Sequence, residues 1–380
     1  MTKKIMTVYG TRPEAIKVAP VVKALEACPD FTSTTVVTGQ HREMLDQVNV
    51  IFGITPDHDL DIFAHGQTLN SIMAKVFEGL DPVLVQEQPD AVVVQGDTST
   101  VAAASIAAFY RQIPVVHIEA GLRSGDITSP FPEEANRRLT SQVTALHLAP
   151  TSTSRDNLLR EGIDPATIAV TGNPVIDALM HTVAQDIAFT DPQLARAEES
   201  GRPIMLVTTH RRESWGGAME GVGRALKHLA LAHPEQLVVL PAHRNPIVRE
   251  AVLPYLVGLD NVIVTEPLAY GEFTRLMAAS HIVLTDSGGV QEEAPSLGKP
   301  VLVMRDNTER PEAVSAGTVR LIGTDEQRIV AEVSRLMDDP GHYARMANAV
   351  NPYGDGRAAE RSVAAIQQLF SLGTRLPDFA

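Results

Sequence analysis

The sequence contains a single cysteine, Cys28, among 380 residues. One thiol cannot form a disulfide within the chain, and it cannot supply the several thiolates of a zinc or iron–sulfur site. The histidines are scattered and show no spacing that is typical of metal ligands. We therefore expect neither a disulfide framework nor a metal centre.

Positive charge and long apolar runs are also scarce. Lys and Arg number 32 against 46 Asp and Glu, which gives a formal net charge of −14. Nucleic acids and anionic membranes require basic surfaces, so neither is expected as a partner. No apolar run is long enough to span a bilayer, and the first ten residues lack a signal-peptide core. These absences predict a soluble cytoplasmic protein.

Short apolar runs alternate with helical patterns along the chain. Runs such as Ile5–Tyr9 and Ala91–Gln95 are typical of strands, and stretches such as Thr100–Arg111 are typical of helices. Strands that alternate with helices indicate βαβ units and a parallel sheet. The series pauses near Gly172, and a second series starts at Ile204.

This pause divides the chain into two predicted α/β domains, as its length also favours. We predict two doubly wound, Rossmann-like domains that face a cleft, over residues 1–171 and 172–355. Residues 356–380 are predicted to form a C-terminal helix that packs back on the first domain. In sheets of this kind, ligands bind beyond the carboxyl ends of the strands.

One turn of the second domain has the composition of an anion site. The strand Ile282–Thr285 runs directly into Asp286–Gly289, which reads DSGG, and then into a helix. Small residues at a helix N-terminus let a phosphate approach free backbone N–H groups. Glu293 follows one turn later, where its carboxylate can accept from two ribose hydroxyls, and Arg310 follows in a polar loop. The DSGG turn alone would be an ordinary connection, but the combination predicts a nucleotide-diphosphate site.

Charged residues follow several predicted strands of the first domain. Asp97 is either functional or the cap of the next helix. Glu119 follows the apolar run VVHI, so its carboxylate is either paired or functional. Glu133 follows a proline and could be a first-turn charge that the helix dipole favours. Arg12 and Lys17, taken alone, would be solvated surface charges.

The turn at Gly10–Lys17 matches neither Walker A nor G-x-G-x-x-G, so neither ATP nor NAD is predicted. In the second domain, His210 is followed by two arginines beyond a strand, which indicates a cluster facing an anion. The alternative is a basic surface patch. Phe273 could stack on a base, although on its own it is better explained by core packing.

Together these segments resemble the non-hydrolysing UDP-N-acetylglucosamine 2-epimerases, over nearly the whole chain. The matching segments are GTRPEAIKVAP at Gly10–Pro20, TGQHREMLDQV at Thr38–Val48, GDTST at Gly96–Thr100, IPVVHIEAGLRSGD at Ile113–Asp126, PFPEEANRRLT at Pro130–Thr140, TGNPVIDAL at Thr171–Leu179, HRRES at His210–Ser214, LTDSGGVQEEAPSLGKPVLVMRDNTERPEAV at Leu284–Val314 and NPYGDGRAAERS at Asn351–Ser362.

The resemblance implies a glycosyltransferase-B-like fold whose C-terminal domain holds most of the UDP. It implies an isomerase that interconverts UDP-N-acetylglucosamine and UDP-N-acetylmannosamine, eliminating UDP to 2-acetamidoglucal and adding it back without a cofactor. An epimerase for a related UDP-2-acetamido sugar, a hydrolysing epimerase, a transferase of the same fold and an inactive nucleotide-sugar sensor stay open as alternatives. The resemblance also implies a homodimer and a role in cell-surface polysaccharide biosynthesis.

The resemblance also assigns residues by position. Asp97, Glu119 and Glu133 are its acid/base carboxylates, and His210 is its catalytic histidine at the diphosphate. The implied substrate contacts are Arg12, Lys17, Phe273, Ser287, Gly288, Gly289, Glu293 and Arg310. Some members bind a second UDP-N-acetylglucosamine as an activator, and its contacts would lie at Gln40, Glu43, Gln67 and His243.

Overall fold

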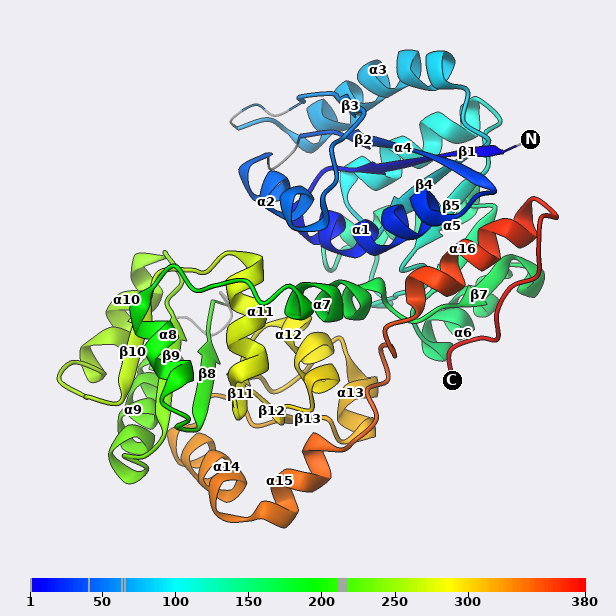
Figure 1. Ribbon diagram of the computed structural model, residues 1–380. Helices are drawn as coiled ribbons and strands as arrows, with labels where there is room; N and C mark the ends of the chain where they lie inside the picture. Colours follow the sequence, from blue (N-terminus) through cyan, green and yellow to red (C-terminus); the bar gives the residue numbers. More distant parts are fainter. Residues whose placement is uncertain (1, 40–41, 63, 65, 211–216) are drawn as a thin grey trace. The chain divides into compact units, whose positions relative to one another are not determined.

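The computed structural model describes residues 2–39, 42–62, 64, 66–210 and 217–380. The chain forms two compact units, Met1–Ala178 with Tyr353–Ala380, and Leu179–Pro352 (Figure 1). The boundary lies inside helix α7 (Pro174–Ala184), a few residues beyond the pause in the sequence pattern. The start of α7 belongs to the first unit because Asp177 accepts from the backbone N–H groups of Ala358 and Ala359, at 3.2 and 2.9 Å.

The first unit contains a seven-stranded parallel sheet with the order β3-β2-β1-β4-β5-β6-β7. Its inner strands are apolar on both faces, as strands between two helix layers must be. The strands are β1 (Lys3–Tyr9), β2 (Phe31–Val37), β3 (His58–Asp59), β4 (Ala91–Gln95), β5 (Val115–Ile118), β6 (Leu146–Ala149) and β7 (Ile168–Val170).

Two hydrophobic layers cover this sheet. On one face, α1 (Arg12–Ala27) and the C-terminal helix α16 (Ala358–Leu369) pack together over the strands, with Leu25 and Ile366 fully buried. On the other face lie α3 (Leu69–Glu87) and α4 (Ser99–Tyr110). The remaining helices of this unit are α2 (Arg42–Phe52), α5 (Glu133–Val143), α6 (Ser152–Arg160) and the 3-10 turn η1 (Pro165–Thr167).

The second unit contains a six-stranded parallel sheet with the order β10-β9-β8-β11-β12-β13. The strands are β8 (Ile204–Thr208), β9 (Leu237–Pro241), β10 (Val262–Thr265), β11 (Ile282–Thr285), β12 (Val301–Val303) and β13 (Val319–Leu321). Its helices are α8 (Pro192–Glu199), α9 (Gly217–Ala232), α10 (Pro246–Val252), α11 (Tyr270–Ala279), α12 (Gly288–Glu293), α13 (Pro311–Ala316), α14 (Glu326–Asp338) and α15 (Pro340–Ala347), with 3-10 turns η3 (Leu253–Tyr255) and η4 (Ala294–Leu297).

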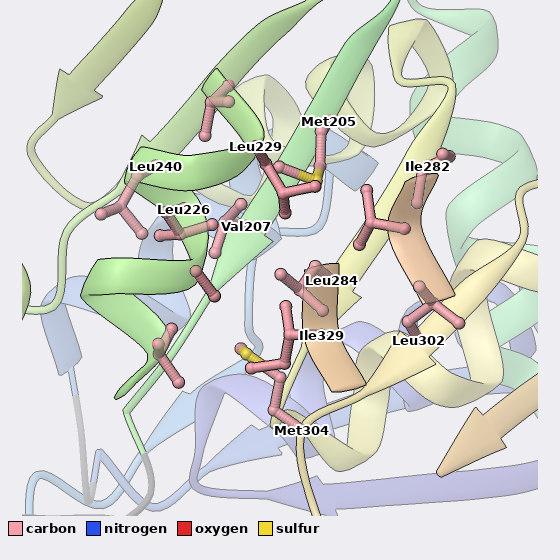
Figure 2. Close-up of a cluster of buried hydrophobic side chains, with 14 of the residues drawn as sticks. Met205, Val207, Leu226, Leu229, Leu240, Ile282, Leu284, Leu302, Met304 and Ile329 are labelled. Atoms are coloured by element: carbon pink, nitrogen blue, oxygen red, sulfur yellow. The ribbon is translucent and has the colours of Figure 1, made fainter. Parts of the chain in front are cut away.

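The core of the second unit lies between this sheet and helices α9 and α14 (Figure 2). Leu226 and Leu229 of α9 and Ile329 of α14 are fully buried with strand residues such as Val207 and Leu284. Each such side chain contributes about 1.5–3 kcal/mol through removal from water. This packing fixes the carboxyl ends of β8 and β11, where the predicted site residues lie.

The predicted class, two doubly wound α/β units, is confirmed. The sequence pattern missed β3, which is only two residues long and pairs at one edge, and it took the start of α7 for a connection. None of the helices that the structure describes has an apolar stretch long enough to cross a membrane.

Candidate functional site

The strand order of each sheet reverses between two central strands, β1 and β4 in the first unit and β8 and β11 in the second. In open α/β sheets, ligands bind beyond the carboxyl ends of the strands at such a reversal. Four predicted residues or segments follow these four strands directly: Arg12 after β1, Asp97 after β4, His210 after β8 and Ser287–Gly289 after β11. The topology therefore gives each unit its own cluster of site residues.

Glu119, directly after β5, is buried and paired with several donors. Its side chain is 7% exposed, and Oε1 accepts from Lys17 Nζ at 2.5 Å and from Asn173 Nδ2 at 3.1 Å. Its Oε2 accepts from Gln95. The Glu119 backbone has φ of 62°, in the left-handed region, which costs a residue other than glycine about 1–2 kcal/mol. The side-chain contacts of Glu119 accompany a strained backbone conformation, and such strain is typical of functional sites.

Gly96, the residue before Asp97, lies beside the Glu119 carboxylate. A Cβ atom on Gly96 would lie 3.7 Å from Glu119 Oε2, so the carboxylate lies against the residue that precedes Asp97. His117 Nε2 lies 2.7 Å from the Gly96 carbonyl oxygen. Burial lowers the pKa of His117 to about 4, so the ring is neutral at pH 7 and donates this hydrogen bond from Nε2–H. The loop that carries Asp97 is thereby fixed beside Glu119.

Asp97 is held by helix α5. Arg137 Nη2 donates to Asp97 Oδ2 at 2.6 Å, and Asn136 Nδ2 donates to the Asp97 carbonyl oxygen at 2.8 Å. The alternative in which Asp97 caps α4 is wrong, because Thr98 is the N-cap residue and accepts from Val101 N. The Asp97 carboxylate instead forms an ion pair with an arginine of a neighbouring helix.

Glu133 and Glu134 are adjacent but differ in their environments. Glu133 is half-buried and is the first residue of α5, one turn before the residues that contact Asp97. Glu134 is fully buried and accepts from Ser124 N at 3.0 Å and from Arg137 and Arg138 at 3.2 Å each. Burial alone would raise the pKa of Glu134, but these hydrogen bonds and charges lower it overall. Glu134 therefore anchors α5 through its buried carboxylate.

In the second unit, Asp286 orients His210. Asp286 is 1% exposed, and its Oδ2 accepts from the His210 backbone N–H at 2.8 Å. Its Oδ1 lies 2.8 Å from His210 Nδ1. A carboxylate beside Nδ1 favours the proton on that nitrogen, which leaves Nε2 as the ring atom suited to contact a ligand. The His210 side chain is 42% exposed and is therefore accessible.

The predicted phosphate turn opens α12. Ser287 is the N-cap residue and Gly288 the first helical residue. A Cβ atom on Gly288 would lie 2.6 Å from Arg310 Nη1, so a larger residue here would displace this guanidinium from the turn. Arg310 also donates from Nε to Glu292 at 2.6 Å. Glu293 ends α12, and its Oε1 would lie 3.7 Å from a Cβ atom on Gly289. The turn thus combines backbone N–H groups and Arg310 with the carboxylates of Glu292, Glu293 and Glu309.

The remaining predicted contacts are Phe273 and the four residues of the activator site. Phe273 is half-buried in α11. The His243 ring lies 6.2 Å from the His210 ring, centroid to centroid, whereas Gln67 accepts from Lys75 at 3.3 Å. Gln40 and the side chain of Glu43 lie outside the described residues.

The sequence interpretation missed the residues that hold the predicted ones in place. They are Gln95, Asn136, Arg137, Asn173 and Asp286. Three of them are buried polar residues at or just beyond a strand end, which was the available signal. Within the described part of the chain, no group of three or more His, Cys, Asp or Glu side chains is arranged to hold a metal ion.

The chain is similar in sequence and fold to known proteins. The profile of the family described as "UDP-N-acetylglucosamine 2-epimerase" matches residues 23–367. The chain is 53% identical to the UDP-N-acetylglucosamine 2-epimerase of Salmonella typhimurium, covering 96% of this chain and 98% of the relative. A crystal structure of a putative UDP-N-acetylglucosamine 2-epimerase from Listeria monocytogenes is similar with a TM-score of 0.95 and 46% identity, covering 100% of both chains.

Two further structures bear on ligand and fold. The UDP-GlcNAc 2-epimerase from Neisseria meningitidis, solved bound to UDP-GlcNAc, is 48% identical with a TM-score of 0.86, covering 96% of this chain and 100% of that one. The glycosyltransferase SnogD from Streptomyces nogalater has a TM-score of 0.63 at 16% identity, which shows a shared fold alone. The resemblance inferred from the sequence segments is therefore confirmed.

Proposed function

We propose a function from one premise: the chain belongs to the UDP-N-acetylglucosamine 2-epimerase family. The proposed reaction is the interconversion of UDP-N-acetylglucosamine and UDP-N-acetylmannosamine by inversion at C2. The observation that carries this proposal is that Asp97 and Glu119 follow the neighbouring strands β4 and β5 and that each is ion-paired. Carboxylates at the same edge of a sheet suit proton removal and delivery at a single carbon.

The chemistry explains why a nucleotide-binding turn accompanies these carboxylates. The C2 proton is weakly acidic, so its removal must be coupled to cleavage of the C1–O bond. The C2–H electron pair becomes the C1=C2 double bond, UDP leaves with the C1–O pair, and the proton moves to an enzyme carboxylate. Addition of UDP to 2-acetamidoglucal, with a proton delivered to the other face of C2, completes the inversion.

We assign the proton transfers to Asp97, Glu119 and Glu133 of the first unit. Lys17 pairs with Glu119 and Arg137 with Asp97, which reduces the electrostatic repulsion between these two negative charges. The proposed route uses neither a metal ion nor an organic cofactor.

We assign UDP to the second unit, where cations and backbone donors can stabilise the leaving diphosphate. His210, oriented by Asp286, and the backbone N–H groups at Ser287–Gly289 would contact phosphate oxygens. Glu293 would accept from the ribose, Arg310 would contact the substrate, and Phe273 would stack on uracil. Arg12 and Lys17 of the first unit would face the phosphate and sugar.

We also propose a cytoplasmic homodimer that supplies sugars for cell-surface polysaccharides. A second UDP-N-acetylglucosamine as activator would contact Gln40, Glu43, Gln67 and His243. The proximity of the His243 and His210 rings supports this, because it links a predicted activator contact to a predicted catalytic residue.

The test is to incubate the purified protein with UDP-N-acetylglucosamine and separate the products by anion-exchange chromatography. We expect an equilibrium mixture that contains UDP-N-acetylmannosamine. Release of UDP with free sugar would favour a hydrolysing epimerase. No change would contradict the proposal and favour a sensor, a transferase that lacks its acceptor, or a related 2-acetamido substrate.

A further inference from the structure

Glu14 is a buried carboxylate that the proposed reaction does not use. It is 2% exposed, and its Oε2 accepts from the backbone N–H groups of Gly10 and Thr11 at 2.7 Å each. The contact from Thr11 belongs to the capping box of α1, in which Glu14 stands at the third helical position and the Thr11 side chain accepts in return from the Glu14 backbone N–H. Capping therefore explains one oxygen of this carboxylate and leaves the other to be explained.

The second oxygen joins a different loop. Glu14 Oε1 accepts from Thr98 Oγ1 at 2.5 Å, and Thr98 directly follows Asp97 and caps α4. A capping box requires no partner from another helix. The contact from Thr98 thus connects the start of α1, after β1, to the start of α4, after β4.

A second contact packs against the loop after β1, and it joins Thr38, directly after β2, to Thr100 in the first turn of α4. Thr38 Oγ1 and Thr100 Oγ1 lie 3.2 Å apart, and both lie against Gly10. A Cβ atom on Gly10 would lie 2.1 Å from Thr38 Oγ1 and 2.9 Å from Thr100 Oγ1. The loops on the two sides of the strand-order reversal are therefore packed with no spare room.

We propose that Glu14 is a positioning residue that fixes the loop of Asp97 relative to the start of α1, which carries Arg12 and Lys17. The inference rests on the proposed function and deepens it. Proton transfer at C2 and cleavage at C1 involve adjacent carbons, so the groups that serve them must keep a fixed separation. A misplacement of about 1 Å can lower a rate by about 10²-fold.

The first test changes Thr98 rather than the carboxylate, because the contacts from the Gly10 and Thr11 backbone N–H groups to Glu14 then stay intact. Thr98→Val keeps the shape and removes the hydroxyl that donates to Glu14 and caps α4, whereas Thr98→Ser keeps both functions and is the matched control. We expect Thr98→Val to lower kcat by about 10²-fold and Thr98→Ser by no more than about threefold. The Kd of UDP, held in the second unit, should change by no more than about threefold in both variants.

The outcomes separate this inference from its premise. An active wild type whose Thr98→Val variant matches Thr98→Ser in kcat would overturn the positioning role alone. A parallel loss of UDP binding in Thr98→Val would do the same, because it would indicate general disruption. A wild type that binds UDP but forms no epimer would overturn the proposed function and this inference with it.

A second variant guards against poor folding of Thr98→Val, which the thermal midpoint would reveal. Glu14→Gln preserves both capping contacts, since Gln also serves in capping boxes, and its amide can still bond to Thr98. We expect Glu14→Gln to retain at least about a tenth of kcat, whereas Glu14→Ala loses about 10²-fold. Equal kcat in these two variants would contradict the inference.

Discussion

Replacing Glu119 with glutamine is expected to stop turnover while the fold and UDP binding remain. The new amide oxygen can accept from Lys17 and Asn173 where Oε1 did, and the Gln95 amide can rotate to accept from the new NH₂ group. What is lost is the charge that pairs with Lys17, worth about 1–3 kcal/mol. A domain with about 5–15 kcal/mol of stability survives that loss.

Glu119→Gln should change the activation barrier by more than it changes the free energy of unfolding. A positioned acid or base contributes about 10²–10⁴-fold, or about 3–5.5 kcal/mol of the activation barrier. The assay measures initial rates by chromatography of the UDP-sugars, the Kd of UDP by calorimetry and the free energy of unfolding in urea. Glu119→Ala is the contrasting variant, because it also leaves Lys17 without this partner and should be the less stable of the two.

Two results would refute the argument for Glu119. Retention of more than about a tenth of wild-type kcat by a folded Glu119→Gln variant would exclude an acid/base role. Loss of folding in the same variant would mean that the carboxylate is structural.

Further predictions concern the phosphate turn and a buried histidine. Gly288→Ala should weaken UDP binding by about tenfold or more, because its Cβ would meet Arg310 Nη1 at 2.6 Å. Gly289→Ala, whose Cβ would have its nearest neighbour at 3.7 Å, should weaken UDP binding less. Calorimetry that finds the larger loss of affinity in Gly289→Ala would be incompatible with the described turn. Burial lowers the pKa of His147 to about 3, below its ordinary value of 6.5, so the neutral ring stabilises the fold above pH 6.5 and this contribution is lost as pH falls toward 3. Between pH 7 and pH 5 the free energy of unfolding in urea should fall by about 2 kcal/mol through His147. His147→Leu should remove that part of the pH dependence of stability. The same pH dependence in wild type and His147→Leu would contradict the lowered pKa.

The strands could be predicted closely because burial between two helix layers makes them continuous apolar runs. Ala91–Gln95 and Val115–Ile118 have the same bounds in the sequence pattern and in the structure. His58–Asp59 carries no such signal, since it is short and lies at a sheet edge. The pause near Gly172 concealed the start of α7, because residues 171–173 belong to no helix or strand and Pro174 then begins the helix.

The site residues could be predicted individually, but their partners could not. Asp97 follows an apolar strand and could be singled out from the local pattern. That Arg137, forty residues later in the chain, contacts it depends on the packing of α5 beside the β4–α4 loop. The contact between Glu14 and Thr98 likewise exists because β1 and β4 are neighbours in the sheet. Such adjacency is a property of strand order, which no local pattern encodes.

The central claim, inversion at C2 through proton removal, is tested most directly by proton NMR of the purified protein with UDP-N-acetylglucosamine in D₂O. The account predicts an equilibrium mixture that contains UDP-N-acetylmannosamine, with deuterium at C2 of both sugars. Epimer that retains its original C2 proton would contradict exchange through the enzyme carboxylates, and a spectrum that stays unchanged would contradict the epimerase itself.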